Sequence, residues 1–197
     1  MNRLKKVIEA AQRAFRAHLE ALLVSGGMSE EQYVRYLSMQ YHLTKGIQRH
    51  FFQIAGNPEL TRRRAFRKFL INFANEEELH FEIAKNDLKN MNRLPLECPL
   101  DVTLWWAYFD SVVASRPFVR LGATVILENI AGPSKDVIQK IFSRAPFVTD
   151  SNCQFFAIQQ QEAHSPHGDQ LLQALTQANL EPAHWDELKK GAEIASV

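Results

Sequence analysis

The chain has 197 residues, a length that suits one hydrophobic core, and we expect residues 1–197 to form a single domain. Its net charge of +1 gives no reason to expect nucleic acid or an acidic membrane as a partner. No stretch is long and apolar enough to span a bilayer, and the first residues are amphipathic, unlike a signal peptide. Cys98 and Cys153 lie far apart and outside any CxxC motif, which fits a reducing compartment and predicts a cytoplasmic protein.

Apolar residues recur at helical spacing through most of the chain, and no segment alternates as a strand does. Ser29 and Gln32 form a capping-box pattern, which predicts a helix start. Pro166 should kink or break the helix that contains it. We predict helices over about residues 4–23, 29–55, 59–91, 100–115, 118–131, 134–143, 152–169, 171–180 and from 182 onward. The pattern therefore favours an all-α fold, built as one helical bundle.

An acid-rich run over residues 75–82 carries one histidine in the middle of a predicted helix. Because residues three and four apart share a helix face, Glu77 or Glu76 can point the same way as His80. A Glu-x-x-His pair that projects into a bundle is a known way to hold iron or manganese. The alternative is a solvated acidic helix face with one ordinary histidine.

Two further sites carry potential ligands. Glu128 lies in an almost wholly apolar helix, where a carboxylate is costly unless it is paired, protonated or bound to metal. The alternative is a carboxylate at the helix edge or in a buried salt bridge. His164 and His167 lie about one helical turn apart and can share a metal, or they can form a polar helix end loosened by Pro166.

The four candidate ligands come from three predicted helices: Glu77, His80, Glu128 and His167. Two carboxylates and two imidazoles suit Fe(II), with Mn(II) as an alternative, and leave positions open for dioxygen.

The chain resembles the haem-oxygenase-like diiron oxidases, also described as iron-containing redox enzymes. The resemblance covers roughly residues 15–175. It is carried by Ser29-Glu30-Glu31-Gln32-Tyr33, Tyr41-His42, Glu76-Glu77-Glu78-Leu79-His80, Asn86-Asp87-Leu88-Lys89, Leu121-Gly122-Ala123 and Leu127-Glu128. The Glu-x-x-His and Leu-Glu segments are its most specific parts.

The resemblance implies a haem-oxygenase-like bundle of about seven helices with iron held between them. It implies that dioxygen and a small organic acid, amine or amino acid are the substrates. Glu77, His80, Glu128 and His167 match the first iron site of the family, with the choice between Glu76 and Glu77 left open.

Departures from the family pattern concern the second iron site. The family's late helix reads His-x-x-x-Asp-x-x-His, and this chain has Gln160, His164 and His167 at those positions. The family also takes a Glu from its second helix, whereas no Asp or Glu lies between Gln32 and Pro58, where His42, Gln48 and His50 are the nearest polar candidates. We therefore expect Gln160 and His164 to line or partly form a second site, and one metal site is better supported than two.

Three other functions remain open. The chain could be a non-catalytic member of the same fold that binds a ligand or partner protein at a degenerate metal site. It could bind or oxygenate haem through His18, although the bulky residues between Gly122 and Gly132 should obstruct a haem, and packing between helices is the alternative role for His18. A thiaminase-like activity would need a nucleophile such as Cys153, with no matching base nearby. Apolar helix faces also allow a homodimer.

Overall fold

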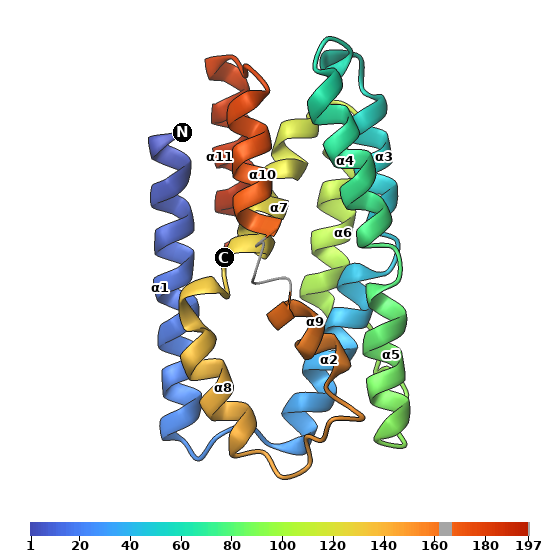
Figure 1. Cartoon of the computed structure of the whole chain (residues 1–197), viewed down its shortest axis with the longest axis vertical. Coiled ribbons are helices and arrows are strands. Elements are labelled where there is room, and N and C mark those ends of the chain that lie inside the picture. The colour runs from blue at the N-terminus through green and yellow to red at the C-terminus, as the bar shows by residue number, and fades with distance from the viewer. Residues whose placement is uncertain (162–166, 197) are drawn as a thin grey trace.

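The computed structural model describes residues 1–161 and 167–196, and the side chains within these ranges except those of residues 159–161. The described residues contain helices and no strand, which confirms the all-α prediction (Figure 1). The elements are α1 (Asn2–Val24), α2 (Glu30–Thr44), α3 (Gln48–Gly56), η1 (Pro58–Leu60), α4 (Arg64–Glu76), α5 (His80–Asn90), α6 (Leu100–Val112), α7 (Pro117–Asn129), η2 (Gly132–Ser134), α8 (Lys135–Ser143), α9 (Gln154–Gln161), α10 (His167–Gln177) and α11 (Pro182–Ala195).

Local sequence signals explain several helix starts. The predicted capping box begins α2: Gln32 N donates to Ser29 Oγ at 3.2 Å, and Ser29 N donates to Gln32 Oε1 at 2.8 Å. Pro117 and Pro182 occupy the first turns of α7 and α11, where a missing N–H costs no helical hydrogen bond. None of the helices in the described residues combines the length with the apolar character that a membrane crossing requires.

Two long helices expected from the sequence are each broken, and that part of the prediction was wrong. The segment 29–55 divides into α2 and α3 around Gly46, whose φ of +83° is a left-handed conformation that glycine adopts readily. The segment 59–91 divides into η1, α4 and α5, with residues 77–79 outside any helix. No glycine or proline marks this second break. The buried contacts of Glu77 with His80 and His167 accompany it.

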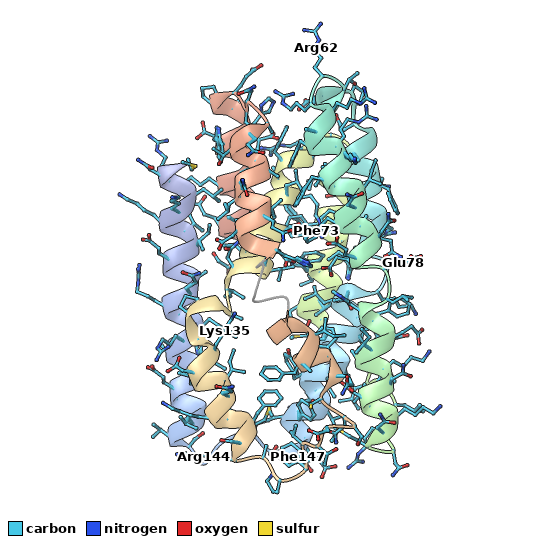
Figure 2. The ribbon with its side chains drawn as sticks, viewed as in Figure 1. Arg62, Phe73, Glu78, Lys135, Arg144 and Phe147 are labelled. Carbon is cyan, nitrogen blue, oxygen red and sulfur yellow. The ribbon has the colours of Figure 1, made fainter. Side chains whose placement is uncertain are left out.

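These interruptions occur at one level of the bundle. In Figure 1, α3, α4 and α10 lie in the upper half of the view, and α2, α5 and α9 lie in the lower half. Side chains near this level point both inward and outward: Figure 2 shows Phe73 in the interior and Glu78 on the outer surface, close to the end of α4. The ends of several helices therefore meet in the middle of the molecule.

Helix α7 runs through the interior without a break, and its residues from Pro117 to Ile126 are all buried. It packs closely on α11 because each helix presents a glycine to the other. A Cβ added to Gly122 would collide with Leu188 O, and one added to Gly191 would collide with Val119 O. This contact holds α7, and the polar side chains that it carries, in a fixed position.

Candidate metal centre

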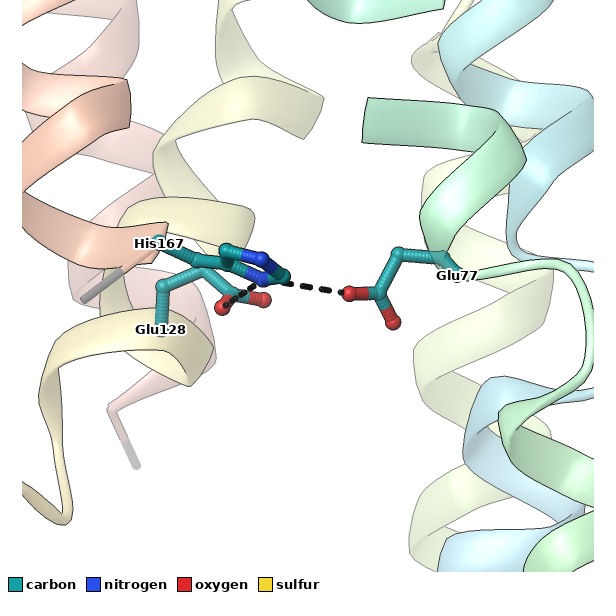
Figure 3. Close-up of side chains that lie close together, drawn as sticks. All are labelled: Glu77, Glu128 and His167. Carbon is teal, nitrogen blue, oxygen red and sulfur yellow. Dashed lines mark ion pairs between the residues drawn. The ribbon is translucent and has the colours of Figure 1, made fainter. Parts of the chain in front are cut away.

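Three residues from different parts of the chain converge at the level of the helix interruptions. Glu77 follows the last residue of α4, Glu128 lies in the last turn of α7, and His167 is the first residue of α10. One donor atom from each lies within 4.8 Å of the others. His167 Nδ1 is 3.5 Å from Glu77 Oε1 and 3.8 Å from Glu128 Oε2 (Figure 3). Such a group has the composition and spacing to hold a metal ion.

The approach of α10 to α7 depends on Gly168, the residue after His167. A Cβ at Gly168 would meet Asn129 Oδ1 at 2.5 Å. Asn129 is itself fixed at the end of α7, because its Nδ2 donates to Val125 O at 2.8 Å and its carbonyl oxygen accepts from Gln12 Nε2 at 2.8 Å. The absence of a side chain at Gly168 thus allows His167 to lie beside Glu128.

The electrostatics of this group favour a cation. The Glu77 side chain is only 8% exposed, and it shares its surroundings with a second carboxylate, that of Glu128. Burial acts to raise the pKa of Glu77, but hydrogen bonds and charges from His167 and His80 outweigh burial, so the pKa of this carboxyl is lowered. An ionised, buried carboxylate beside another carboxylate is a good ligand for a metal ion.

His80 contacts the candidate centre through Glu77. His80 Nδ1 lies 2.7 Å from Glu77 Oε2, whereas the other oxygen of Glu77, Oε1, faces His167. His80 is 6% exposed, and it lies outside the group of three donor atoms. In this arrangement it orients the Glu77 carboxylate, as outer hydrogen-bond partners of metal ligands commonly do.

The structure also separates Glu76 from Glu77. Glu76 Oε2 lies 3.5 Å from His167 Nε2, but the Glu76 side chain is 56% exposed. Glu77 is the buried residue of the two, and its donor atom is the one grouped with Glu128. His164 and Pro166 lie outside the described residues, as does the side chain of Gln160, so their predicted roles stay predictions.

Two of the three polar candidates of the second predicted helix, His42 and His50, have other partners. His42 Nε2 lies 2.8 Å from Leu96 O, in the linker before α6. His50 is fully buried and contacts Arg120 and Asp110. Gln48 Oε1 is buried and has no hydrogen-bond partner among the described residues.

Arg120 is a buried charged residue that the sequence predictions do not include. It lies on α7 eight residues before Glu128, and its side chain is fully buried. A charge within an apolar helix is costly, so the sequence predicts a buried partner or ligand for Arg120 as it does for Glu128.

The structure gives His18 and Gly122, the two residues considered for haem binding, other surroundings and roles. His18 is exposed on α1, so the packing role expected for it was wrong. Gly122 serves the close contact of α7 with α11, where its missing side chain is required for packing. Nothing in these two positions favours a haem pocket.

In comparisons with known proteins, no family model and no curated sequence matches the chain. A solved structure does: a domain of unknown function with a heme oxygenase-like fold from Shewanella denitrificans OS217. The two share 18% sequence identity with a TM-score of 0.83, over 99% of this chain and 86% of that one. An agreement of this extent confirms the fold that the resemblance implied. The chain has a haem oxygenase-like fold.

Proposed function

We propose that Glu77, Glu128 and His167 bind a divalent transition-metal ion, Fe(II) or Mn(II), and that the protein is an oxidase that acts on a small organic molecule with dioxygen. The observation that supports this most is the convergence of three donor atoms within 4.8 Å, from three separated segments. Carboxylate oxygens suit manganese, imidazole suits iron, and the mixed set suits both. Three protein ligands leave coordination positions open for a substrate.

The residues around this centre have roles that follow from their contacts. Bound iron would supply the one-electron chemistry that dioxygen needs. His80 holds Glu77 in place through its Nδ1 contact of 2.7 Å. Phe73 packs edge-on against His167, with ring centroids 5.2 Å apart, and keeps water from that side of the imidazole. We propose a single metal because, within residues 1–161 and 167–196, only this group of three meets the spacing of a metal site.

The first experiment measures metal content. Wild-type protein, Glu128→Ala and the control Glu31→Ala are purified without chelator, reconstituted anaerobically with Fe(II) or Mn(II), and analysed for bound metal. Glu31 is an exposed carboxylate on α2, far in sequence from the three ligands. We expect about one equivalent in wild type and in the control, and none in Glu128→Ala.

Equal metal in all three proteins, or none in any, would contradict the site. In that case the carboxylates are structural, and the chain is a ligand- or partner-binding protein on this fold. If the metal binds as expected, dioxygen consumption by the Fe(II) protein is measured with small acids, amines and amino acids. A metal-loaded protein that consumes no dioxygen with any of them would contradict the oxidase activity while retaining the site.

A further inference from the structure

One hydrogen-bond donor of Arg120 has no acceptor among the described residues. Its Nε donates to His50 Nδ1 at 2.8 Å, and its Nη1 donates to Thr124 Oγ1 at 2.7 Å. Its Nη2 is buried and has no hydrogen-bond partner among the described residues. Buried guanidinium donors are normally all paired, because an unpaired one loses its hydration without replacement. This nitrogen therefore has no acceptor in the described part of the chain and can take one from a ligand.

Among the described residues, no carboxylate forms an ion pair with Arg120. Burial lowers the pKa of Arg120 to about 9, and the charges of Glu128 and Asp110 oppose this only in part. Asp110 approaches only through His50, whose Nε2 lies 2.6 Å from Asp110 Oδ1. Because His50 Nδ1 accepts from Arg120, the imidazole carries its proton on Nε2 and is neutral. Burial and the charge of Arg120 lower the pKa of His50 to about 4, which agrees with a neutral ring. A buried cation without a contacting anion is unfavourable, and an anionic ligand would remove that cost.

The guanidinium and the candidate metal centre border the same part of the interior. Aromatic rings connect them: Phe51 lies 5.6 Å from the Arg120 guanidinium and 4.9 Å from Phe73, and Phe73 lies 5.2 Å from His167. Along α7, Arg120, Thr124 and Glu128 occupy successive turns of one face. Arg120 Nη1 reaches Thr124, and four helical residues rise about 6 Å, so the distance from the guanidinium to Glu128 is within the length of a short molecule.

Trp105 and Phe109 complete the surroundings of the guanidinium, at 4.7 and 5.5 Å. Ring faces hold the cation by their quadrupoles and offer no competing acceptor oxygen. They also favour an apolar carbon chain over water.

We propose that Arg120 binds the carboxylate of a small carboxylic acid through Nη2, and directs its carbon chain toward Glu77, Glu128 and His167. This inference rests on the proposed function and narrows its substrate class from acids, amines and amino acids to molecules with a carboxylate. A charge-assisted bond from guanidinium to carboxylate is among the strongest hydrogen bonds in proteins. An amine without a carboxylate would place a second cation beside Arg120 and is disfavoured.

The test measures binding in metal-free protein, so that it does not depend on the metal. Acetate, butyrate, octanoate and alanine are titrated, and Trp105, which lies over the guanidinium, reports binding through tryptophan fluorescence, with the melting temperature as a second readout. Butyramide and butylamine are the matched uncharged and cationic probes. We expect at least one carboxylate to bind and raise the melting temperature, and neither matched probe to do so.

Variants then assign the binding to Arg120. Arg120→Met should weaken carboxylate binding at least tenfold, and Arg120→Lys, which keeps the charge without the planar fork, by about tenfold. Arg116→Met is the control, because Arg116 lies just before α7 and pairs with Glu187 at 2.8 Å. Circular dichroism checks the fold. If Arg120→Met does not fold, carboxylate binding is measured in Arg120→Lys and in Thr124→Val instead. Thr124→Val removes the hydrogen-bond partner of Arg120 Nη1.

The outcomes separate this inference from the proposed function. Absence of carboxylate binding in both metal-free and Mn(II)-loaded protein would overturn it. Binding that survives Arg120→Met, or that is lost in Glu128→Ala and present only with Mn(II), would also overturn it, because the metal would then take the carboxylate. Carboxylate binding by Arg120 in a protein that takes up no metal would support it while the oxidase proposal fails.

Discussion

Helix α7 carries two buried polar clusters with opposite needs. The acidic cluster, Glu128 with Glu77 and His167, brings together two carboxylates and one imidazole. The basic cluster, Arg120 with His50, contains a buried guanidinium nitrogen without an acceptor in the described part of the chain. The first brings two carboxylates together, and the second holds a buried guanidinium among aromatic rings. Under the two proposals above, the first would bind a cation and the second an anion, at opposite ends of one face of α7.

The two clusters also differ in how the backbone builds them. The acidic cluster uses residues at helix ends: Glu77 follows α4, and His167 begins α10. The basic cluster uses residues within helices, with His50 in the first turn of α3 and Arg120 in the first turn of α7. A site made from residues next to helix breaks depends on how separate segments approach one another, whereas a site made from residues within helices depends on their side-chain contacts. Substitutions can therefore affect one cluster, the other, or both.

Replacement of Gly122 by alanine should disturb both clusters at once and have the largest effect. The added Cβ would collide with Leu188 O and approach Ala192 N to 2.8 Å, so α7 must move away from α11. We expect the free energy of unfolding to fall by about 3 kcal/mol, measured by urea denaturation. Gly56→Ala is the control, because a Cβ at Gly56 meets nothing within 4 Å. Equal stability of the two variants would contradict the close contact between α7 and α11. The clusters would then not depend on that contact for their positions.

The pH dependence of the free energy of unfolding should show that His50, in the basic cluster, is buried in its neutral form. Folded His50 has a pKa lowered to about 4 from 6.5 by burial and by Arg120, so the unfolded chain binds one more proton between these pH values. The stabilisation is therefore present above pH 6.5 and is lost as pH falls to 4. We expect wild type to lose about 2 kcal/mol more than His50→Gln over this range, because glutamine can replace both hydrogen bonds without titrating.

Urea unfolding at a series of pH values measures this difference. His18→Gln serves as the control, because it makes the same substitution at an exposed histidine on α1. A His50→Gln profile that coincides with wild type would mean that His50 does not supply the neutral link between Arg120 and Asp110. The description of the basic cluster, with a neutral His50 between Arg120 and Asp110, would then be wrong.

Replacement of Gly168 by alanine should affect the acidic cluster alone and have the smallest effect. Its Cβ would meet the Asn129 side chain, which can turn aside only by giving up its hydrogen bond to Val125 O, so we expect α10 and His167 to shift slightly. We expect about tenfold weaker metal affinity, which corresponds to about 1.4 kcal/mol, in an anaerobic Mn(II) titration. Gly132→Ala is the control, since nothing lies within 4 Å of a Cβ there. An unchanged affinity would show that the approach of α10 to α7 does not limit the site.

The sequence was most informative where a polar residue contradicts its apolar surroundings. Glu128 was predicted in this way, and in the structure it lies beside Glu77 and His167. Arg120 carries the same signal and was not predicted. Its partner His50 lies 70 residues away, and Asp110 lies 60 residues from His50, so no local pattern links them. Contacts of this range depend on tertiary packing.

The helix interruptions were harder to predict than the helices. Gly46 gave a weak signal for the break between α2 and α3. Residues 77–79 gave none, because neither proline nor glycine occurs there and Glu and Leu are good helix formers. The structure associates this break with burial of Glu77 against His80 and His167, an effect of tertiary contacts that outweighs local preference.

The starting points of α5 and α10 have a consequence for the acidic cluster. His80 and His167 are the first residues of these helices, and Leu79, which precedes α5, provides no side-chain cap. The amino end of an α-helix carries about half a positive charge from its aligned peptide dipoles. Both ends adjoin Glu77: His80 follows it by three residues, and His167 Nδ1 lies 3.5 Å from Glu77 Oε1. If the site binds a metal ion as proposed, this partial positive charge would help to hold the ionised Glu77 carboxylate in position before the ion binds.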